Sequence, residues 1–354
     1  MKILQVIPYF CFGGAETMCE NLTYALQKLG HEVTVVSLYN EHTPIARRME
    51  AAGVQIEYLD KKLGLDVSMV PKLMKIMKRV KPDVVHTHLD VVKYAALAAR
   101  LTGVKRCVHT VHNVAQKEAE GLARKINRVY YRLGLARPVA LSPEVQKTIA
   151  EVYGLPEEKI PVIYNGIDLS KCVPKGEYAD KETMILLHIG RFNGQKNHEG
   201  LLMAFQAVAQ KYPNCRLSLV GDGELRPEME ALAEKLGIAG QVDFLGSQSD
   251  VHPFLHSADL FMLPSHYEGM PMTIIEAMAT ALPIVATAVG GVSDMVENEK
   301  SALLTQCDVP SVSDACIRLL EDSQLRERLG RQALACSVRF SAEQMATDYC
   351  KVYQ

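Results

Sequence analysis

The chain has 354 residues, enough for two domains that each bury a core. Hydrophobic residues make up 48% and charged residues 23%, as in an ordinary globular protein. The 39 basic and 41 acidic side chains give a net charge of −2, which argues against a nucleic-acid-coating protein but leaves a local basic patch open. Nine irregularly spaced cysteines without a Cys-x-x-Cys pair favour neither a disulfide framework nor a zinc site, and fit a reducing cytoplasm.

The first strand-like run begins the chain, and Gln5 and Pro8 interrupt it. We therefore interpret it as a buried strand and not as a signal peptide. Apolar runs with β-branched residues then alternate with helical patterns, such as Met18, Leu22 and Leu26 on one face. Several runs are apolar on both faces, which is typical of a parallel sheet covered on two sides. The expected strands of this half are 3–7, 33–38, 55–59, 84–87, 107–111, 139–141 and 162–164.

The second half repeats the strand–helix plan from residue 184 onward. The repeat predicts an α/β protein of two Rossmann-like parallel-sheet domains, 1–167 and 168–340, with a linker in the polar segment 166–182. Ligands of such sheets bind beyond the carboxyl ends of the strands, and we expect these ends to face each other across a cleft. The weakly polar stretch 270–291 contains a glutamate and two prolines, so it predicts strand and helix and not a membrane span. Further strands are expected at 184–189, 216–220, 242–245, 260–263, 284–286 and 302–304.

In each half, a glycine loop follows the first strand. Gly13 and Gly14 precede a helix whose N-terminus would attract an anion, although a tight turn explains the pair equally well. In the second half, Gly190 and Arg191 are followed by Lys196, and two cations at this place suit a diphosphate. An ordinary charged surface loop is the alternative to this interpretation.

A third glycine loop, Gly221-x-Gly223, follows the next strand and indicates a turn that permits close approach of a ligand. Neither half contains Gly-x-Gly-x-x-Gly, so an NAD-dependent dehydrogenase is disfavoured. Two acids come after a later strand: Glu268 lies in a loop and Glu276 lies in the following helix, where it could reach a diol. A capping box, Thr273-x-x-Glu276, is the alternative explanation of the second acid.

Four histidines, His86, His88, His109 and His112, follow two strands of the first half. His-x-His is a spacing found in metal sites. However, the chain contains no Asp-x-Asp, so an acidic clamp of that type for a metal and a diphosphate is absent. We interpret these histidines as hydrogen-bonding a ligand or the opposite domain, with at least one of each pair a packed structural residue.

The basic, amphipathic segment 117–137 either contacts an anionic membrane surface or covers its own domain as a solvated helix.

Together these motifs resemble the retaining glycosyltransferases of family 4. The similarity rests on Pro264-Ser265-x-x-Glu268-Gly269-x-Pro271 with Glu276, the family's Glu-x7-Glu signature, and on further motifs in the family's order. These further motifs are Gly13-Gly14, Thr110-x-His112, Asn165-Gly166-x-Asp168, Gly190-Arg191 with Lys196, Gly221-x-Gly223 and Phe244-Leu245-Gly246. The resemblance implies the GT-B fold, with helix 341–354 returning to the first domain and a nucleotide-sugar bound between the domains.

The resemblance also implies roles for individual residues. Arg191 and Lys196 would hold the donor diphosphate, Glu276 the ribose, and Glu268 the donor sugar, which His112 would face from the first domain. The remaining donor-binding residues would be Gly13, Gly14, Gly190, Gly221, Gly223, Leu245, Gly246, Gly269, Met270, Pro271 and Met272. No metal and no cofactor besides the nucleotide-sugar are expected, because fixed cations would stabilise the leaving group.

One departure from the family pattern is Ala281, where relatives commonly carry glycine. The implied activity is a metal-independent hexosyl transfer with retention to a saccharide or lipid-linked acceptor in surface polysaccharide or glycolipid synthesis, in the cytoplasm or peripherally on the inner membrane face. Two alternatives stay open: a nucleotide-sugar epimerase of the same fold, and a non-catalytic nucleotide-sugar binding subunit. No nucleic-acid partner is expected.

Overall fold

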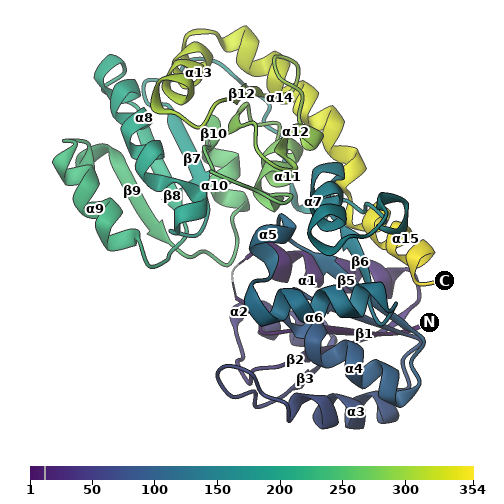
Figure 1. The fold of residues 1–354 in the computed structure, drawn as a ribbon. Coiled ribbons are helices and arrows are strands. Elements are labelled where there is room, and N and C mark those ends of the chain that lie inside the picture. The colour runs from purple at the N-terminus through teal and green to yellow at the C-terminus, as the bar shows by residue number, and fades with distance from the viewer. Residues whose placement is uncertain (12) are drawn as a thin grey trace. The chain divides into compact units, whose positions relative to one another are not determined.

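A computed structural model describes residues 1–11 and 13–354 of the chain. It divides into two compact units, an N-terminal unit of Met1–Gly166 with Ala342–Gln354, and a C-terminal unit of Ile167–Ser341. Each unit contains one six-stranded, all-parallel sheet with helices on its faces (Figure 1). This is the doubly wound architecture that the repeated strand–helix pattern predicted.

The N-terminal sheet has the strand order β3-β2-β1-β4-β5-β6. Its order reverses between β1 and β4, so the connections after these two strands leave toward opposite faces of the sheet. The strands are β1 (Lys2–Ile7), β2 (Glu32–Ser37), β3 (Gln55–Tyr58), β4 (Val84–His88), β5 (Arg106–Val111) and β6 (Arg137–Ala140). The helices are α1 (Gly14–Lys28), α2 (Pro44–Ala51), α3 (Met69–Val80), α4 (Val92–Thr102), α5 (Ala115–Glu118), α6 (Gly121–Arg132), α7 (Pro143–Tyr153) and α15 (Ala342–Val352).

The C-terminal sheet has the equivalent order β12-β11-β10-β7-β8-β9, with its reversal between β7 and β10. The strands are β7 (Ile185–Ile189), β8 (Arg216–Val220), β9 (Val242–Gly246), β10 (Leu260–Leu263), β11 (Ile284–Thr287) and β12 (Leu303–Thr305). The helices are α8 (His198–Lys211), α9 (Arg226–Lys235), α10 (His252–Ser257), α11 (Met272–Ala279), α12 (Val292–Met295), α13 (Val309–Glu321) and α14 (Ser323–Ser337). Within residues 1–11 and 13–354, every helix is too short or too polar to span a membrane.

Each sheet is the centre of its own hydrophobic core. Leu4 and Val85 are fully buried in the N-terminal unit, and Leu186 and Leu217 are fully buried in the C-terminal unit. Burying one such side chain contributes about 1.5–3 kcal/mol. Strands β1, β4 and β7 are buried on both faces, which explains why apolar residues occupy consecutive positions in them instead of alternating ones.

Helix α15 completes the N-terminal unit, where it packs against α1. Tyr349 in this helix and Tyr353 directly after it are buried, and their hydroxyls reach polar side chains of β4 and β5. Tyr353 lies 2.6 Å from Nδ1 of His86, and Tyr349 lies 2.6 Å from Oγ1 of Thr110. The last helix therefore belongs structurally to the first sheet.

Two predicted features differ in the structure. Residues 162–164 do not form a strand, since Val162 makes a single bridge to Ala140 and the preceding Pro161 has no N–H with which to extend the ladder. Most of the predicted linker also packs onto the C-terminal unit. Lys175 donates its backbone N–H to Thr280 and pairs through Nζ with buried Asp259 at 2.9 Å. The segment is polar because its charged groups have partners in that unit.

Candidate functional site

The predicted cations and acids of the C-terminal unit follow the two strands at which the sheet reverses. Lys196 ends the short 3-10 helix η4 (Gly194–Lys196) after β7, and Glu268 lies in the loop after β10. Since β7 and β10 are neighbours in a parallel sheet, their carboxyl ends bring these loops together. The structure thus joins two residues that are 72 positions apart in the sequence.

Lys196 and Glu268 form a nearly buried ion pair. Nζ of Lys196 lies 2.7 Å from Oε1 of Glu268, and their side chains are 16% and 4% exposed. Gln195 donates through Nε2 to the other carboxylate oxygen at 3.2 Å and to the carbonyl of Tyr267 at 3.0 Å. Gln195 belongs to none of the sequence motifs described above. The arrangement holds a fixed cation and a fixed acceptor side by side at the edge of the sheet.

Arg191 does not take part in this pair in the structure. Its guanidinium lies 3.6 Å from Glu224, and both side chains are 60% exposed. An exposed pair of this kind contributes about 0–1 kcal/mol, so the arginine can exchange this partner for a ligand at little cost.

The glycines after β7 and β8 and at the end of β9 allow neighbouring loops to approach one another. Gly221 has φ +140°, and a Cβ on it would lie 2.0 Å from the carbonyl oxygen of Gly190. A Cβ on Gly223 would lie 2.4 Å from the carbonyl oxygen of Phe192. Gly221 also donates to the carbonyl of Gly246 at 2.9 Å, directly after Leu245. The glycine motif thus serves close contact between backbones, in addition to any approach of a ligand.

A further glycine pair, which the sequence analysis did not assign to the site, supports the loop of Glu268. Gly290 has φ +53°, and a Cβ on it would lie 1.8 Å from the carbonyl oxygen of Glu268. Gly291 donates to the carbonyl of Gly269 at 2.9 Å. A Gly-Gly pair directly after strand β11 was the signal that could have identified this contact.

Helix α11 begins at Met272 with Pro271 as its N-cap residue, and no side chain caps it. The predicted capping box is therefore not formed, and the hydroxyl of Thr273 is buried without a hydrogen-bond partner among the described residues. Met270 and Met272 are each 4% exposed, so mainly their backbone groups remain for a ligand. The capping box predicted as an alternative role for Glu276 is therefore wrong, because Thr273 lies inside the helix and not at its N-cap position.

Glu276 lies on α11 and is largely buried. The residue is 9% exposed, and its carboxyl group has no hydrogen-bond partner within the described part of the chain. Burial, together with the nearby charge of Asp250, raises the pKa of Glu276 to about 8. A buried carboxyl group without a partner is a feature of ligand-binding sites, since a bound hydroxyl can satisfy it.

Gly13 and Gly14 lie at the start of α1 in the N-terminal unit. Gly13 is the N-cap residue in an extended conformation, with φ −157°. Glu16 in the first turn is buried, and its Oε2 lies 2.5 Å from where a Cβ of Gly13 would be. A helix N-terminus attracts negative charge, and here an acidic side chain of the protein itself lies in its first turn.

The four histidines, of which three lie in β4 and β5 and His112 directly follows β5, separate into two kinds. His86 is fully buried, and both of its ring nitrogens have partners, Tyr353 and Thr110. His109 is also buried, and its Nδ1 lies 2.9 Å from the hydroxyl of Thr87. These two are structural. His112 is only partly buried and contacts His88, with 3.1 Å between its Nε2 and Nδ1 of His88. Within the described residues, no group of three or more His, Cys, Asp or Glu side chains is arranged to hold a metal ion.

The basic residues of segment 117–137 are largely engaged within their own unit. Arg124 donates to the carbonyls of Ala119 and Gln116. Arg128 and Arg132 donate to carbonyls in the last turn of α7, and so cap that helix. The apolar side chains Leu122, Val129 and Leu133 are exposed by 62%, 49% and 69%. The segment presents apolar groups to its surroundings while most of its arginines stabilise the fold.

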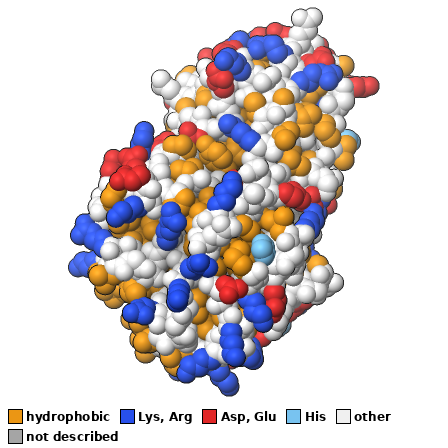
Figure 2. Space-filling model, turned by 90° about the vertical axis from the view of Figure 1, so that its right-hand side faces the viewer, with side chains coloured by type: hydrophobic (Ala, Val, Ile, Leu, Met, Phe, Trp, Pro, Cys, Tyr) orange, Lys and Arg blue, Asp and Glu red, His pale blue; other side chains and the backbone are white. Residues whose placement is uncertain are grey.

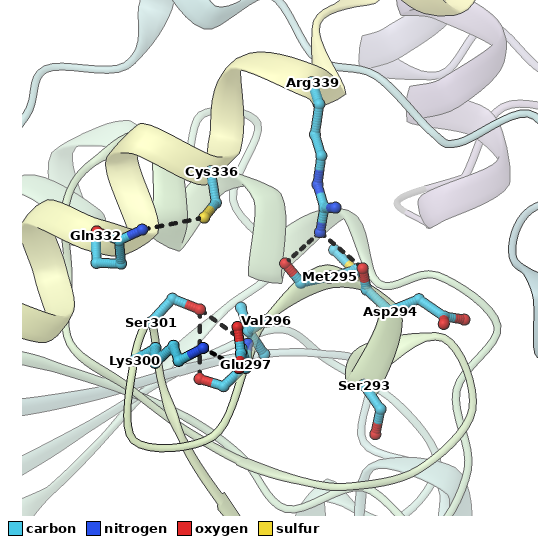
Figure 3. Close-up of a pocket in the computed structure, with 10 residues that line it drawn as sticks. All are labelled: Ser293, Asp294, Met295, Val296, Glu297, Lys300, Ser301, Gln332, Cys336 and Arg339. Atoms are coloured by element: carbon cyan, nitrogen blue, oxygen red, sulfur yellow. Dashed lines mark hydrogen bonds and ion pairs between the residues drawn. The ribbon is translucent and has the colours of Figure 1, made fainter.

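A pocket of about 350 Å³ lies elsewhere in the C-terminal unit, between α12 and α14 (Figure 3). Arg339 donates to the backbone carbonyls of Asp294 and Met295 across it. None of the residues that line it is a predicted site residue.

Figure 2 shows lysine and arginine side chains spread over one face with acidic and hydrophobic ones between them, and not gathered into a single basic patch.

Comparison with known proteins places this geometry in a family. The family Glycosyl transferases group 1 matches residues 174–335, and Glycosyltransferase Family 4 matches residues 12–171. The putative glycosyltransferase EpsF of Bacillus subtilis is 30% identical over 301 residues, which cover 80% of this chain and 78% of the relative. The UDP-Gal:alpha-D-GlcNAc-diphosphoundecaprenol alpha-1,3-galactosyltransferase of Escherichia coli is 32% identical over 284 residues, covering 73% of this chain and 72% of the relative.

The fold is also shared with solved structures. The Anabaena protein Alr3699/HepE, in complex with UDP and glucose, superposes with a TM-score of 0.85 at 22% identity, over 99% of this chain and 98% of that one. WaaG, a glycosyltransferase involved in lipopolysaccharide biosynthesis, gives a TM-score of 0.74 at 18% identity over the full length of both chains. The chain belongs to glycosyltransferase family 4, and it is a retaining, metal-independent enzyme of GT-B fold that uses a nucleotide sugar.

Proposed function

We propose that the C-terminal unit binds a nucleoside diphosphate hexose and that the hexosyl group is transferred to a hydroxyl of a saccharide or lipid-linked acceptor. The observation that carries this proposal is the buried Lys196–Glu268 pair at the reversal of the C-terminal sheet. A fixed cation there can meet a phosphate, while the neighbouring carboxylate can accept hydrogen bonds from sugar hydroxyls.

The donor would contact three further groups of this unit. Arg191, which is exposed and weakly paired, would turn to the diphosphate together with Lys196. Glu276, buried without a partner, would accept or share a hydrogen bond with the ribose diol. The backbone of Gly269–Met272 would hold the sugar, and the turns at Gly190, Gly221, Gly223 and Leu245–Gly246 would border the nucleobase. From the N-terminal unit, Gly13–Gly14 and His112 would act on the diphosphate and the sugar.

The reaction breaks the bond between the anomeric carbon and the diphosphate oxygen, and the bonding electrons go to the leaving phosphate. The acceptor oxygen forms its bond on the same face, and its proton passes to the leaving phosphate. The transition state resembles an oxocarbenium ion beside a departing anion. Lys196 and Arg191 stabilise the charge that develops on that anion, at about 1.5–3 kcal/mol for each charged contact.

The acceptor and the location belong to the same proposal. The Escherichia coli relative is named for a diphosphoundecaprenol-linked acceptor. The exposed apolar residues of α6 would lie against the inner face of the cell membrane, where such an acceptor would be reached from the cytoplasm. The product would be a surface polysaccharide or a glycolipid, with no nucleic acid involved.

A donor panel tests the proposal. Titration calorimetry with UDP-, GDP- and ADP-sugars, beginning with UDP-galactose and UDP-glucose, should give binding to at least one sugar nucleotide that Glu276→Gln weakens. With an acceptor, NMR of the product should show the anomeric configuration of the donor, and EDTA should leave the rate unchanged. Binding that Glu276→Gln and Lys196→Ala leave intact would overturn the placement of the donor, and an inverted product would overturn the same-face step.

A further inference from the structure

Three side chains of the N-terminal unit form a continuous hydrogen-bonded chain across the reversal of its sheet. Gln5 comes from β1, His88 from the end of β4, and His112 from the loop after β5. Oε1 of Gln5 lies 2.9 Å from Nε2 of His88, and Nδ1 of His88 lies 3.1 Å from Nε2 of His112. Gln5 and His88 are completely buried, so no water competes for these contacts.

The direction of the first hydrogen bond is fixed by Thr23 in α1. The hydroxyl of Thr23 donates its one proton to the carbonyl of Cys19 at 2.8 Å. It can therefore only accept from Nε2 of Gln5, which lies 2.7 Å away. This orients the amide group so that Oε1, which cannot donate, faces His88. Nε2 of His88 must then carry the proton of that hydrogen bond.

The second hydrogen bond follows from the first. Burial lowers the pKa of His88 well below 6.5, so the ring is neutral and holds a single proton, on Nε2. Its Nδ1 is then a bare acceptor, and Nε2 of His112 must donate to it. Burial, together with His109, lowers the pKa of His112 to about 3, so this ring is neutral as well. Its Nδ1 has no partner among the described residues.

We propose that Gln5 and His88 are positioning residues that lock His112 in its Nε2–H tautomer and leave its Nδ1 as a hydrogen-bond acceptor for a hydroxyl of the sugar substrate. The inference rests on the proposed function in one respect, that His112 contacts the sugar. A neutral ring with a bare nitrogen is attracted to a hydroxyl donor and not to a phosphate oxyanion. The chain from Thr23 to His112 therefore assigns this histidine to the sugar and not to the leaving diphosphate.

The tautomer can be measured without any substrate. Ring-nitrogen NMR of the full chain labelled with ¹⁵N-histidine should show a protonated Nε2 and a bare Nδ1 for His112 near pH 7.5, assigned by comparison with His112→Gln. A protonated Nδ1, a charged ring, or a mixture of tautomers in the unmodified protein would overturn the proposal. Because the spectrum needs no donor, this outcome is separate from failure of the proposed function, which His112→Ala with unchanged kcat/KM would signal.

Two variants test the hydrogen bonds that connect Gln5, His88 and His112. Gln5→Met keeps the volume but removes the acceptor, so the His112 signals should shift toward a tautomer mixture and kcat/KM should fall about tenfold, the effect of one hydrogen bond. Tyr353→Phe is the matched control, because it removes a buried hydroxyl from His86 and leaves the chain from Thr23 to His112 intact. It should lower the unfolding temperature without moving the His112 signals. Equal His112 spectra in both variants and the unmodified protein would contradict the proposal.

Discussion

Lys196 and Glu268 are balanced against each other in the protein without a donor. In the proposed mechanism, Lys196 gains a second anionic partner when the diphosphate binds, and this contact would strengthen as negative charge moves onto the leaving group. A charge of this kind acts more on the transition state than on substrate binding. In the proposed site, the pair would therefore link the stability of the loop to catalysis.

Replacement of Lys196 by alanine should lower kcat by about 10- to 100-fold, with a smaller change in KM, as expected for the loss of one charged contact. Steady-state kinetics measures both constants. Lys211→Ala is the control, because that lysine pairs with Glu321 on the surface. Thermal unfolding recorded in parallel should show a loss of stability, since buried Glu268 is left without a counter-charge, at about 3–5 kcal/mol. An unchanged kcat would refute the role of Lys196.

Glu276 predicts a pH dependence of stability. Its pKa is about 8 in the folded protein and near 4.5 when unfolded, so between these values only the folded state holds the proton. Stability therefore falls as the pH rises from 4.5 to 8. Glu276→Gln cannot ionise, and its melting temperature should exceed that of the unmodified protein at pH 8.5 while matching it at pH 5. Exposed Glu234→Gln should show no such difference, and a gain at pH 5 alone would contradict the prediction.

At the scale of elements, the loop after β11 supports the loop after β10. Gly290→Ala should be strongly destabilising and should lower donor affinity, because a Cβ would lie 1.8 Å from the carbonyl oxygen of Glu268 and push that loop away. Gly237→Ala is a matched control, since Gly237 also has a positive φ, +73°, but nothing lies within 4 Å of its Cβ position.

The control should cost only the left-handed backbone strain of about 1 kcal/mol. Chemical denaturation and calorimetric titration with the donor distinguish the two variants. Equal losses of stability and equal donor affinity would show that the contact with the Glu268 loop is unimportant.

The end of α11 has a backbone conformation that favours glycine at the position of Ala281. Ala281 has φ +56°, the left-handed conformation that ends a helix, and Leu282 donates to the carbonyl of Ala277 as in a Schellman motif. Its methyl group is buried, which offsets part of the backbone strain. The sequence identified Ala281 as a departure from the family pattern. Its left-handed conformation could be recognised only from the structure of the helix end.

At the scale of the whole molecule, acid should act unequally on the two units. Burial holds His86, His88, His109 and His112 neutral in the N-terminal unit, and His188 and His198 in the C-terminal unit. Each has a folded pKa below the unfolded value of 6.5, so its stabilisation is complete above pH 6.5 and is lost as the pH falls toward 4 and below. Each unit also contains one acid with a raised pKa, Glu118 and Glu276, so these two contributions roughly offset each other.

The N-terminal unit should therefore lose stability faster than the C-terminal unit between pH 6.5 and 4. Scanning calorimetry across this range should show one transition splitting into two, with the N-terminal unit melting first. Its transition can be identified by Tyr353→Phe, which weakens that unit alone. If the C-terminal unit melts first on acidification, the buried histidines do not govern the acid response.

The sequence predicted the two sheets because buried parallel strands have recognisable apolar runs and glycine loops mark their ends. It also predicted Lys196 and Glu268, although their contact depends on β7 and β10 being neighbours, which no local pattern encodes. Gln195, Gly290 and the chain from Thr23 to His112 were missed for the same reason. Each of these contacts depends on a partner in a distant segment of the sequence. Neither the residue type nor the local spacing predicts such a partner. The capping box failed as an alternative because the helix begins two residues earlier than the box requires.

Helix α15 has a consequence for how the protein is made. Residues 342–354 leave the ribosome after the entire C-terminal unit, yet they supply the hydroxyls that His86 and Thr110 bind inside the N-terminal unit. Domains usually fold in the order of their synthesis. Here Nδ1 of His86, in the half that is translated first, lacks its partner until Tyr353 has been made.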